Sequence, residues 1–157
     1  MLATALLTTH LSDTPGLQTK RGTGRLQRLV TAVATAKPFY QEVAAASATS
    51  EQQLLIKVLQ RHCSESGWIV LVAPKQFPSK ALANYLQLPV DKILVIHADT
   101  IKEPAKTLHT LLHTSSCRVI INFSQLEADE LTSQLSKCAA EQQRWFYQFN
   151  HLTSQTH

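Results

Sequence analysis

Residues 66–76 read SGWIVLVAPKQ and predict a buried β-strand. Their apolar part, WIVLVA at 68–73, has no polar residue at alternate positions and ends at Pro74. A half-exposed strand alternates apolar and polar residues, whereas a strand covered on both faces is apolar throughout. We therefore expect residues 68–73 to form an interior strand of a sheet that carries helices on both faces.

On either side of this strand, apolar runs alternate with segments of helical periodicity. Strands are predicted at 92–97, 117–123 and 144–149, with an edge-like strand at 39–45. Helices are predicted at 26–36, 50–63, 79–86, 103–115 and 125–143. This alternation predicts a single α/β domain with a mainly parallel sheet and helices on both faces.

Several of these helices begin at residues that favour a helix start. Ser79 and Ser124 are expected N-caps, because their hydroxyls can accept a free backbone N–H. Thr49 or Ser50 followed by Glu51 looks like a helix start, and Pro104 stands where its missing N–H costs nothing.

Size and composition favour one compact domain. The chain has 157 residues, of which 44% are hydrophobic and 17% are charged. No stretch approaches the roughly 20 apolar residues of a membrane-spanning helix, so no membrane partner is expected. Residues 1–9 lack the basic start and the cleavage site of a secretory signal, which predicts a cytoplasmic protein.

The positive charge is confined to the beginning of the chain. Residues 1–37 hold five Lys or Arg against Asp13 alone, so the whole net charge of +4 lies there. We expect a flexible basic leader at 1–37, an α/β domain at 38–149 and a tail at 150–157. Because the domain itself is neutral, it has no obvious phosphate-tracking face, and nucleic acid is not an expected partner. Nucleic-acid binding by the leader remains an alternative.

Nucleotide binding is not expected, because no phosphate-binding loop is present. Only four glycines occur in the chain, and none lies in a GxxxxGK[ST] motif. After the strand at 68–73, Pro74 and Pro78 remove N–H donors that phosphates would need. No Gly-x-Ser-x-Gly motif supports nucleophilic catalysis either.

The best metal candidate is the pair His109 and His113, which lie four residues apart on one helical face. Cys117 follows at a short distance, but the Glu of HExxH and a clear third ligand are missing. The other cysteines, Cys63 and Cys138, form no Cys-x-x-Cys motif, which favours reduced thiols over disulfides. We therefore expect no metal, no other cofactor and no enzymatic activity.

The chain resembles the SulA family of cell division inhibitors, which the SOS response to DNA damage induces. The resemblance covers 42–150 and begins with the Trp-headed strand at 66–76. Further matches are Ser79-Lys80, Leu88-Pro89, Lys92, the strand at 118–121, the acidic helix start at 126–131 and the terminal His157. It implies a RecA-like α/β fold without nucleotide binding. It also implies binding to the tubulin-like GTPase FtsZ, which blocks FtsZ polymerisation and septum formation.

The resemblance also implies particular site residues. The FtsZ-binding stretch falls on Leu111, Leu112, His113, Thr114, Ser115, Ser116 and Cys117, and residues important for inhibition fall on Val72, Leu82 and Lys92. For Val72, inside an apolar strand, we favour packing in the core. For Lys92 we favour contact with a partner, because lysine is rarely buried without an ion-pair partner. Phe77, Leu82 and Lys92 could form an apolar patch with a polar rim.

A second implied partner is the ATP-dependent protease Lon, which recognises the C-terminal tail of SulA proteins. That tail corresponds here to Asn150, His151, Leu152, Thr153, Ser154, Gln155, Thr156 and His157, and we expect it to be disordered. A homodimer is a further open alternative. The competing interpretation of the chain is a degenerate nucleotide-binding or metal-binding α/β enzyme.

Overall fold

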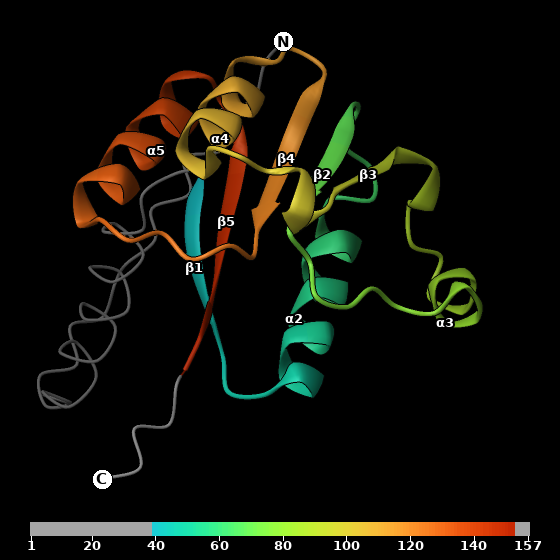
Figure 1. Cartoon of the computed structure of the whole chain (residues 1–157). Coiled ribbons are helices and arrows are strands. Elements are labelled where there is room, and N and C mark those ends of the chain that lie inside the picture. The colour runs from blue at the N-terminus through green and yellow to red at the C-terminus, as the bar shows by residue number, and fades with distance from the viewer. Residues whose placement is uncertain (1–38, 153–157) are drawn as a thin grey trace, which may run out of the picture. The chain divides into compact units, whose positions relative to one another are not determined.

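The computed structural model describes residues 39–152 and contains one five-stranded sheet with all neighbouring strands parallel (Figure 1). The order across the sheet is β1-β5-β4-β2-β3. The strands are β1 (Tyr40–Ala45), β2 (Trp68–Val72), β3 (Ile93–Ile96), β4 (Cys117–Asn122) and β5 (Trp145–His151). The sequence-based expectation of an interior strand at 68–73 is confirmed, because β2 lies between β4 and β3.

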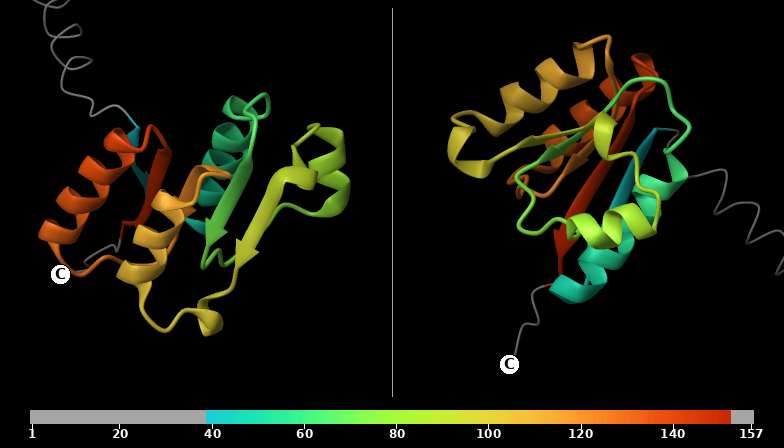
Figure 2. Two further views of the ribbon diagram at one scale, coloured as in Figure 1. Left: turned by 90° about the horizontal axis from the view of Figure 1, so that it is seen from above. Right: turned by 90° about the vertical axis from the view of Figure 1, so that its right-hand side faces the viewer.

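Helices cover both faces of this sheet. They are α2 (Ala48–Arg61), α3 (Lys80–Tyr85), α4 (Pro104–His113) and α5 (Asp129–Glu141), with 3-10 turns at Val90–Lys92 and Ala98–Thr100. Helices α4 and α5 lie on one face, and α2 and α3 lie on the other (Figure 2). The predicted α/β class with a parallel sheet and helices on both faces is confirmed.

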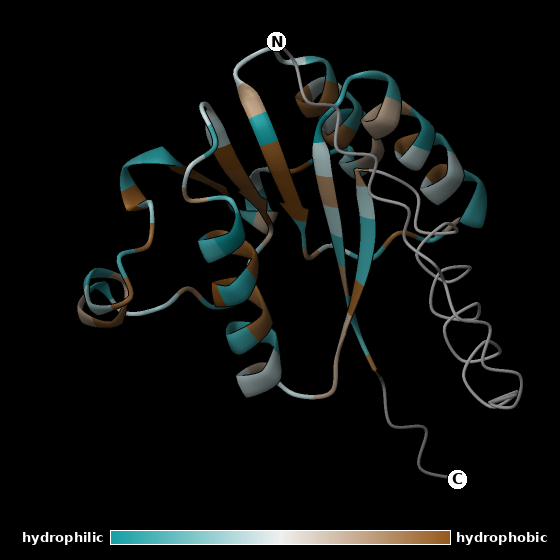
Figure 3. Ribbon diagram, turned by 180° about the vertical axis from the view of Figure 1, so that it is seen from behind, coloured by the Kyte–Doolittle hydropathy of each residue, from teal (hydrophilic) through white to brown (hydrophobic). Residues whose placement is uncertain are grey.

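Alternation along the strands divides the core into two halves. Val70 and Ile120 pack under α4 and α5, whereas Leu71 and Ile121 pack under α2. All four are at most 1% exposed. Figure 3, seen from the side on which α2 lies, shows the apolar segments of the middle strands in brown. Burial on both faces explains why these strands are apolar throughout.

The helix starts follow local capping chemistry in most cases. The Ser79 hydroxyl accepts a hydrogen bond from the Leu82 N–H at 3.3 Å, and Pro104 opens α4. Helix α2 begins slightly earlier than predicted, because Ser47 forms a capping box with Ser50. Each cap satisfies backbone groups that lack a partner within the helix.

Two predictions at the C-terminal half are wrong in detail. Ser124 does not cap α5, which begins at Asp129; the Ser124 hydroxyl instead donates a hydrogen bond to Asn122 Oδ1 at 2.7 Å. Strand β5 continues to His151, so Asn150 and His151 belong to the sheet and not to a free tail. The pairing of β5 with β1 extends it, because Ala45 lies opposite His151.

The predicted leader at 1–37 and the predicted helix at 26–36 lie outside the described residues, as do residues 153–157. Within the part of the chain that the structure describes, no helix is both long and apolar enough to cross a membrane.

Candidate partner-binding site

The stretch from Leu111 to Cys117 forms the last turn of α4 and the turn into β4. Leu112 and Cys117 are buried under the sheet face that α4 covers, so they hold the turn in place. His113, Ser115 and Ser116 are exposed, and Leu111 and Thr114 are half-buried. Only part of the predicted binding stretch can therefore meet a partner.

Arg144 fixes this turn from inside the protein. Its Nε donates to the Leu112 carbonyl at 3.1 Å, and its Nη1 donates to the carbonyls of Ser115, at 3.0 Å, and of Cys117. The residue is only 8% exposed, so these bonds replace the water that a guanidinium normally holds. The positive charge also lies at the carboxyl end of α4, where the helix dipole favours it.

Sequence reasoning did not single out Arg144. The one available signal was an arginine that opens an otherwise apolar strand, since arginine is seldom fully buried without partners. Its three acceptors are about 30 residues away in the sequence, and no local pattern identifies them.

A second set of contacts joins the turn to the start of β2. The Trp68 N–H donates to the Ser116 carbonyl at 2.8 Å, and Arg118 Nε donates to the Ser66 carbonyl at 3.3 Å. Gly67 between them has φ +133°, and a Cβ there would lie 2.6 Å from Arg118 Cγ and 2.8 Å from the Ser116 carbonyl oxygen. Any other residue would therefore be strained at this position.

Lys92 lies beside the turn at 113–117, at the edge of the sheet that is formed by the amino ends of the parallel strands. Its side chain is exposed, and Nζ donates to the Glu65 carbonyl at 3.1 Å. The beginnings of β3 and β4 flank the beginning of β2, so they are about 10 Å apart, or two strand spacings. The structure thus brings Lys92 and the exposed part of the Leu111–Cys117 stretch to one edge.

The other predicted residues do not join this edge. Val72 ends β2 at the opposite edge of the sheet and is 0% exposed, which agrees with the expectation of core packing. Leu82 is half-buried on α3. Phe77 lies in the loop after the carboxyl end of β2, whereas Lys92 lies just before the amino end of β3. The expected patch of Phe77, Leu82 and Lys92 therefore does not gather at one end of these two parallel strands.

Most of the exposed large apolar side chains belong to the segment that runs from β2 to β3. Six of the seven large apolar residues that are exposed in the described chain lie between 68 and 95: Trp68, Phe77, Tyr85, Val90, Leu94 and Val95. We call the last four, on α3, on the 3-10 turn and on β3, the β3 flank. Strand β3 pairs only with β2, and neither of its faces is fully covered. Leu94 and Val95 are successive residues of β3 and face opposite sides of the sheet, so exposed apolar area lies on both faces of this outermost strand. Exposed apolar area often marks an interaction site.

The loop after β2 lacks the run of backbone N–H donors that binds a phosphate group in nucleotide-binding loops. Pro74 and Pro78 interrupt the N–H groups of the loop, and α3 is only six residues long. The nearby polar side chains Asn122 and Gln148 are buried and bond to each other at 2.8 Å. Both also bond to Ser124, so their amide groups are occupied within the protein.

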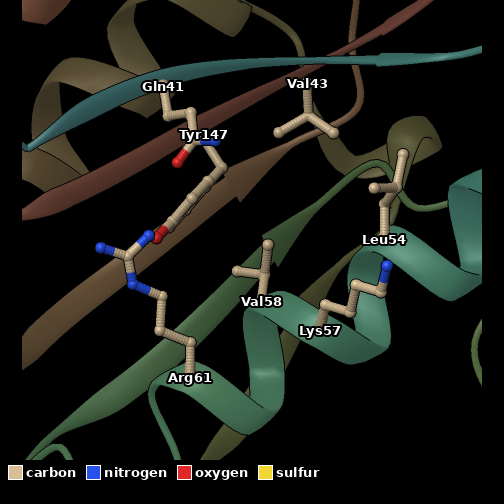
Figure 4. A pocket seen from close by; sticks show the side chains of 7 residues that line it. All are labelled: Gln41, Val43, Leu54, Lys57, Val58, Arg61 and Tyr147. Carbon is tan, nitrogen blue, oxygen red and sulfur yellow. The ribbon is translucent and has the colours of Figure 1, made fainter. Parts of the chain in front are cut away.

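A separate cavity of about 200 Å³ lies between β1 and α2 (Figure 4). It is lined by Gln41, Val43, Leu54, Lys57, Val58, Arg61 and Tyr147. Behind it, the Tyr147 hydroxyl lies 2.7 Å from His62 Nε2. Burial lowers the pKa of His62 and raises that of Tyr147. These groups belong to the core under α2 and are on a different face from the Leu111–Cys117 stretch.

The cysteines and histidines are arranged differently from the sequence-based expectation. His109 and His113 lie near Cys138 of α5 and not near Cys117, which is in β4. Burial, and to a smaller extent the charge of Glu141, raises the pKa of the Cys138 thiol.

Comparison with known proteins identifies the fold. No family model matches the chain, and no curated protein matches it by sequence. One solved structure, SulA from Pseudomonas aeruginosa, superposes with a TM-score of 0.56 over 71% of this chain and 97% of that chain. The chain has a SulA-like fold. At 18% identity this similarity concerns the fold, and SulA-like topology confirms the expectation drawn from the strand at 66–76.

Proposed function

We propose that this chain inhibits bacterial cell division as SulA proteins do, by binding FtsZ and blocking its polymerisation. The observation that carries the proposal is the SulA-like fold, which spans nearly the whole chain of P. aeruginosa SulA. The Trp-headed strand at 66–76 and Lys92, which are among the residues that carry the family resemblance, support the same assignment.

The proposed binding surface combines two neighbouring features. One is the edge formed by Lys92, His113, Ser115 and Ser116, which supplies a polar rim. The other is the β3 flank, which supplies exposed apolar area. Protein interfaces combine an apolar centre with a polar rim in this way. Strand β3 begins directly after Lys92, so the two features adjoin at this residue.

The proposed mechanism is occupancy and not turnover. An inhibitor that covers the surface by which FtsZ subunits join needs only shape and charge complementarity, and it must match its target in number. The prolines of the loop after β2 and the internally bonded pair Asn122 and Gln148 support a role without nucleotide hydrolysis.

Sedimentation of FtsZ with GTP tests the proposal. Adding the full chain at a one-to-one ratio is expected to abolish the FtsZ pellet, whereas a tenfold smaller amount should leave most of it. Loss of polymer at catalytic amounts of the protein, or an unchanged pellet at equimolar amounts, would contradict the proposed mechanism. Expression in cells should produce long filaments without septa.

A charge reversal at Lys92 locates the surface. The Lys92→Glu variant is expected to need several-fold more protein for the same inhibition, because a rim charge affects encounter and contact and not the core. Lys57→Glu is the matched control, since Lys57 is also exposed but lies on α2. Equal inhibition by both variants would remove Lys92 from the site.

A further inference from the structure

Two helices place three metal-ligating side chains together beside the turn at 113–117. His109 and His113 lie on α4, four residues apart, and Cys138 lies on the adjacent helix α5. One imidazole nitrogen of each histidine and the Cys138 sulfur all lie within 4.8 Å of one another. The ring centroids of the two histidines are 4.5 Å apart.

The separations suit a shared metal ion. Typical bonds of about 2.0–2.1 Å to nitrogen and 2.3 Å to sulfur, at a tetrahedral angle, place a nitrogen and a sulfur ligand about 3.6 Å apart. Cys138 Sγ and His113 Nε2 are 3.5 Å apart. The remaining ligand, His109, is on the exposed face of α4, where a change of rotamer can shorten the longer separations.

The donor set also indicates which ion would bind. One thiolate and two imidazoles are borderline-soft ligands, which suit Zn²⁺ and not the oxygen-preferring Mg²⁺ or Ca²⁺. Cys138 is 9% exposed while both histidines face solvent, so an ion could enter from the histidine side and be held against α5. Three protein ligands leave the fourth tetrahedral position for water or for a group of another molecule.

We propose that His109, His113 and Cys138 form a Zn²⁺ site that links the end of α4 to α5. Binding forms one Zn–S bond and two Zn–N bonds, and the thiol proton of Cys138 is released to solvent. The site does not depend on the proposed binding of FtsZ, because the packing of α4 against α5 through Leu108, Leu112 and Leu135 is what brings the three ligands together. It would stabilise the helix turn that precedes Ser115 and Ser116.

Spectroscopic titration of the full, chelator-treated chain with Co²⁺ tests the site. One equivalent of Co²⁺ is expected to give the visible bands of a tetrahedral ion and a thiolate-to-cobalt charge-transfer band, and one equivalent of Zn²⁺ should remove both. Zn²⁺ at about 100 times its dissociation constant should also increase the folded-to-unfolded ratio about 100-fold, measured by urea unfolding. Absence of the bands at one equivalent would overturn the proposal.

Substitutions assign the ligands. Cys138→Ser should abolish the charge-transfer band, and Cys117→Ser, the matched buried control, should retain it. His109→Ala changes only an exposed side chain, so it keeps the test valid if Cys138→Ser fails to fold; it should weaken Co²⁺ binding at least tenfold. A band that survives Cys138→Ser, or that disappears in Cys117→Ser, would refute this ligand set. Unchanged binding in His109→Ala would refute it equally.

Discussion

Replacing Arg144 by methionine should cost about 3 kcal/mol of unfolding free energy. Methionine keeps much of the aliphatic volume but removes the three hydrogen bonds to the carbonyls of Leu112, Ser115 and Cys117. Bonds to a charged group contribute about 1.5–3 kcal/mol each, so three of them sum to roughly 4.5–9 kcal/mol. Burying the guanidinium costs several kcal/mol in lost hydration, which offsets part of this sum.

Urea unfolding and thermal melting measure this loss. For a domain of this size, a loss of about 3 kcal/mol lowers Tm by roughly 12 °C. Arg118→Met is the matched control, because Arg118 is exposed and makes one bond, to the Ser66 carbonyl; its effect should stay within about 0.5 kcal/mol. If Arg144→Met were destabilised by less than 1 kcal/mol, the turn at 113–117 would not depend on this side chain.

Three further predictions concern other parts of the chain. Gly67→Ala should lower the unfolding free energy by about 2 kcal/mol in urea titrations, because a Cβ at φ +133° would lie 2.8 Å from the Ser116 carbonyl oxygen; wild-type stability would mean that the backbone relaxes freely. Because burial lowers the pKa of His62 in the folded protein, the unfolded chain binds a proton first as the pH falls below about 7, and the folded state loses stability. In His62→Gln, the unfolding free energy should fall less between about pH 7 and 5, and a fall equal to that of the wild type would exclude His62 as its source. Deleting His157 should lengthen the half-life of the protein in cells that contain Lon and leave FtsZ inhibition unchanged, and equal half-lives of the two forms would show that His157 is not the degradation signal.

Local sequence patterns predicted the helices and strands, because the interactions that start and stop these elements join residues that are close in the sequence. The apolar run at 68–73 became the interior strand β2, since only a strand buried on both faces tolerates apolar residues at every position. Ser79 capped α3 as expected, because the hydroxyl and the N–H that it accepts are three residues apart. The same rule failed at Ser124, because α5 begins only at Asp129 and has Ala128 at its N-cap; the Ser124 hydroxyl donates to Asn122 Oδ1 instead.

The candidate site was predicted only in part, because its surface depends on which elements are neighbours. The stretch at 111–117 and Lys92 came from a family resemblance, and the structure adds that they share one edge of the sheet. The exposure of the β3 flank could not be derived from the run at 92–97. An apolar strand has the same sequence pattern whether it is the outermost strand of a sheet, as β3 is, or an interior one.

The sequence alone determined the α/β class, the order of the elements and the absence of a GxxxxGK[ST] loop, because periodicity and motifs are properties of neighbouring residues. The tertiary structure alone decided that Arg144 holds the turn before β4 and that Cys138, and not Cys117, faces His109 and His113. These contacts join residues about 25–30 positions apart, so they exist only because the parallel sheet places α4, α5 and the start of β5 side by side.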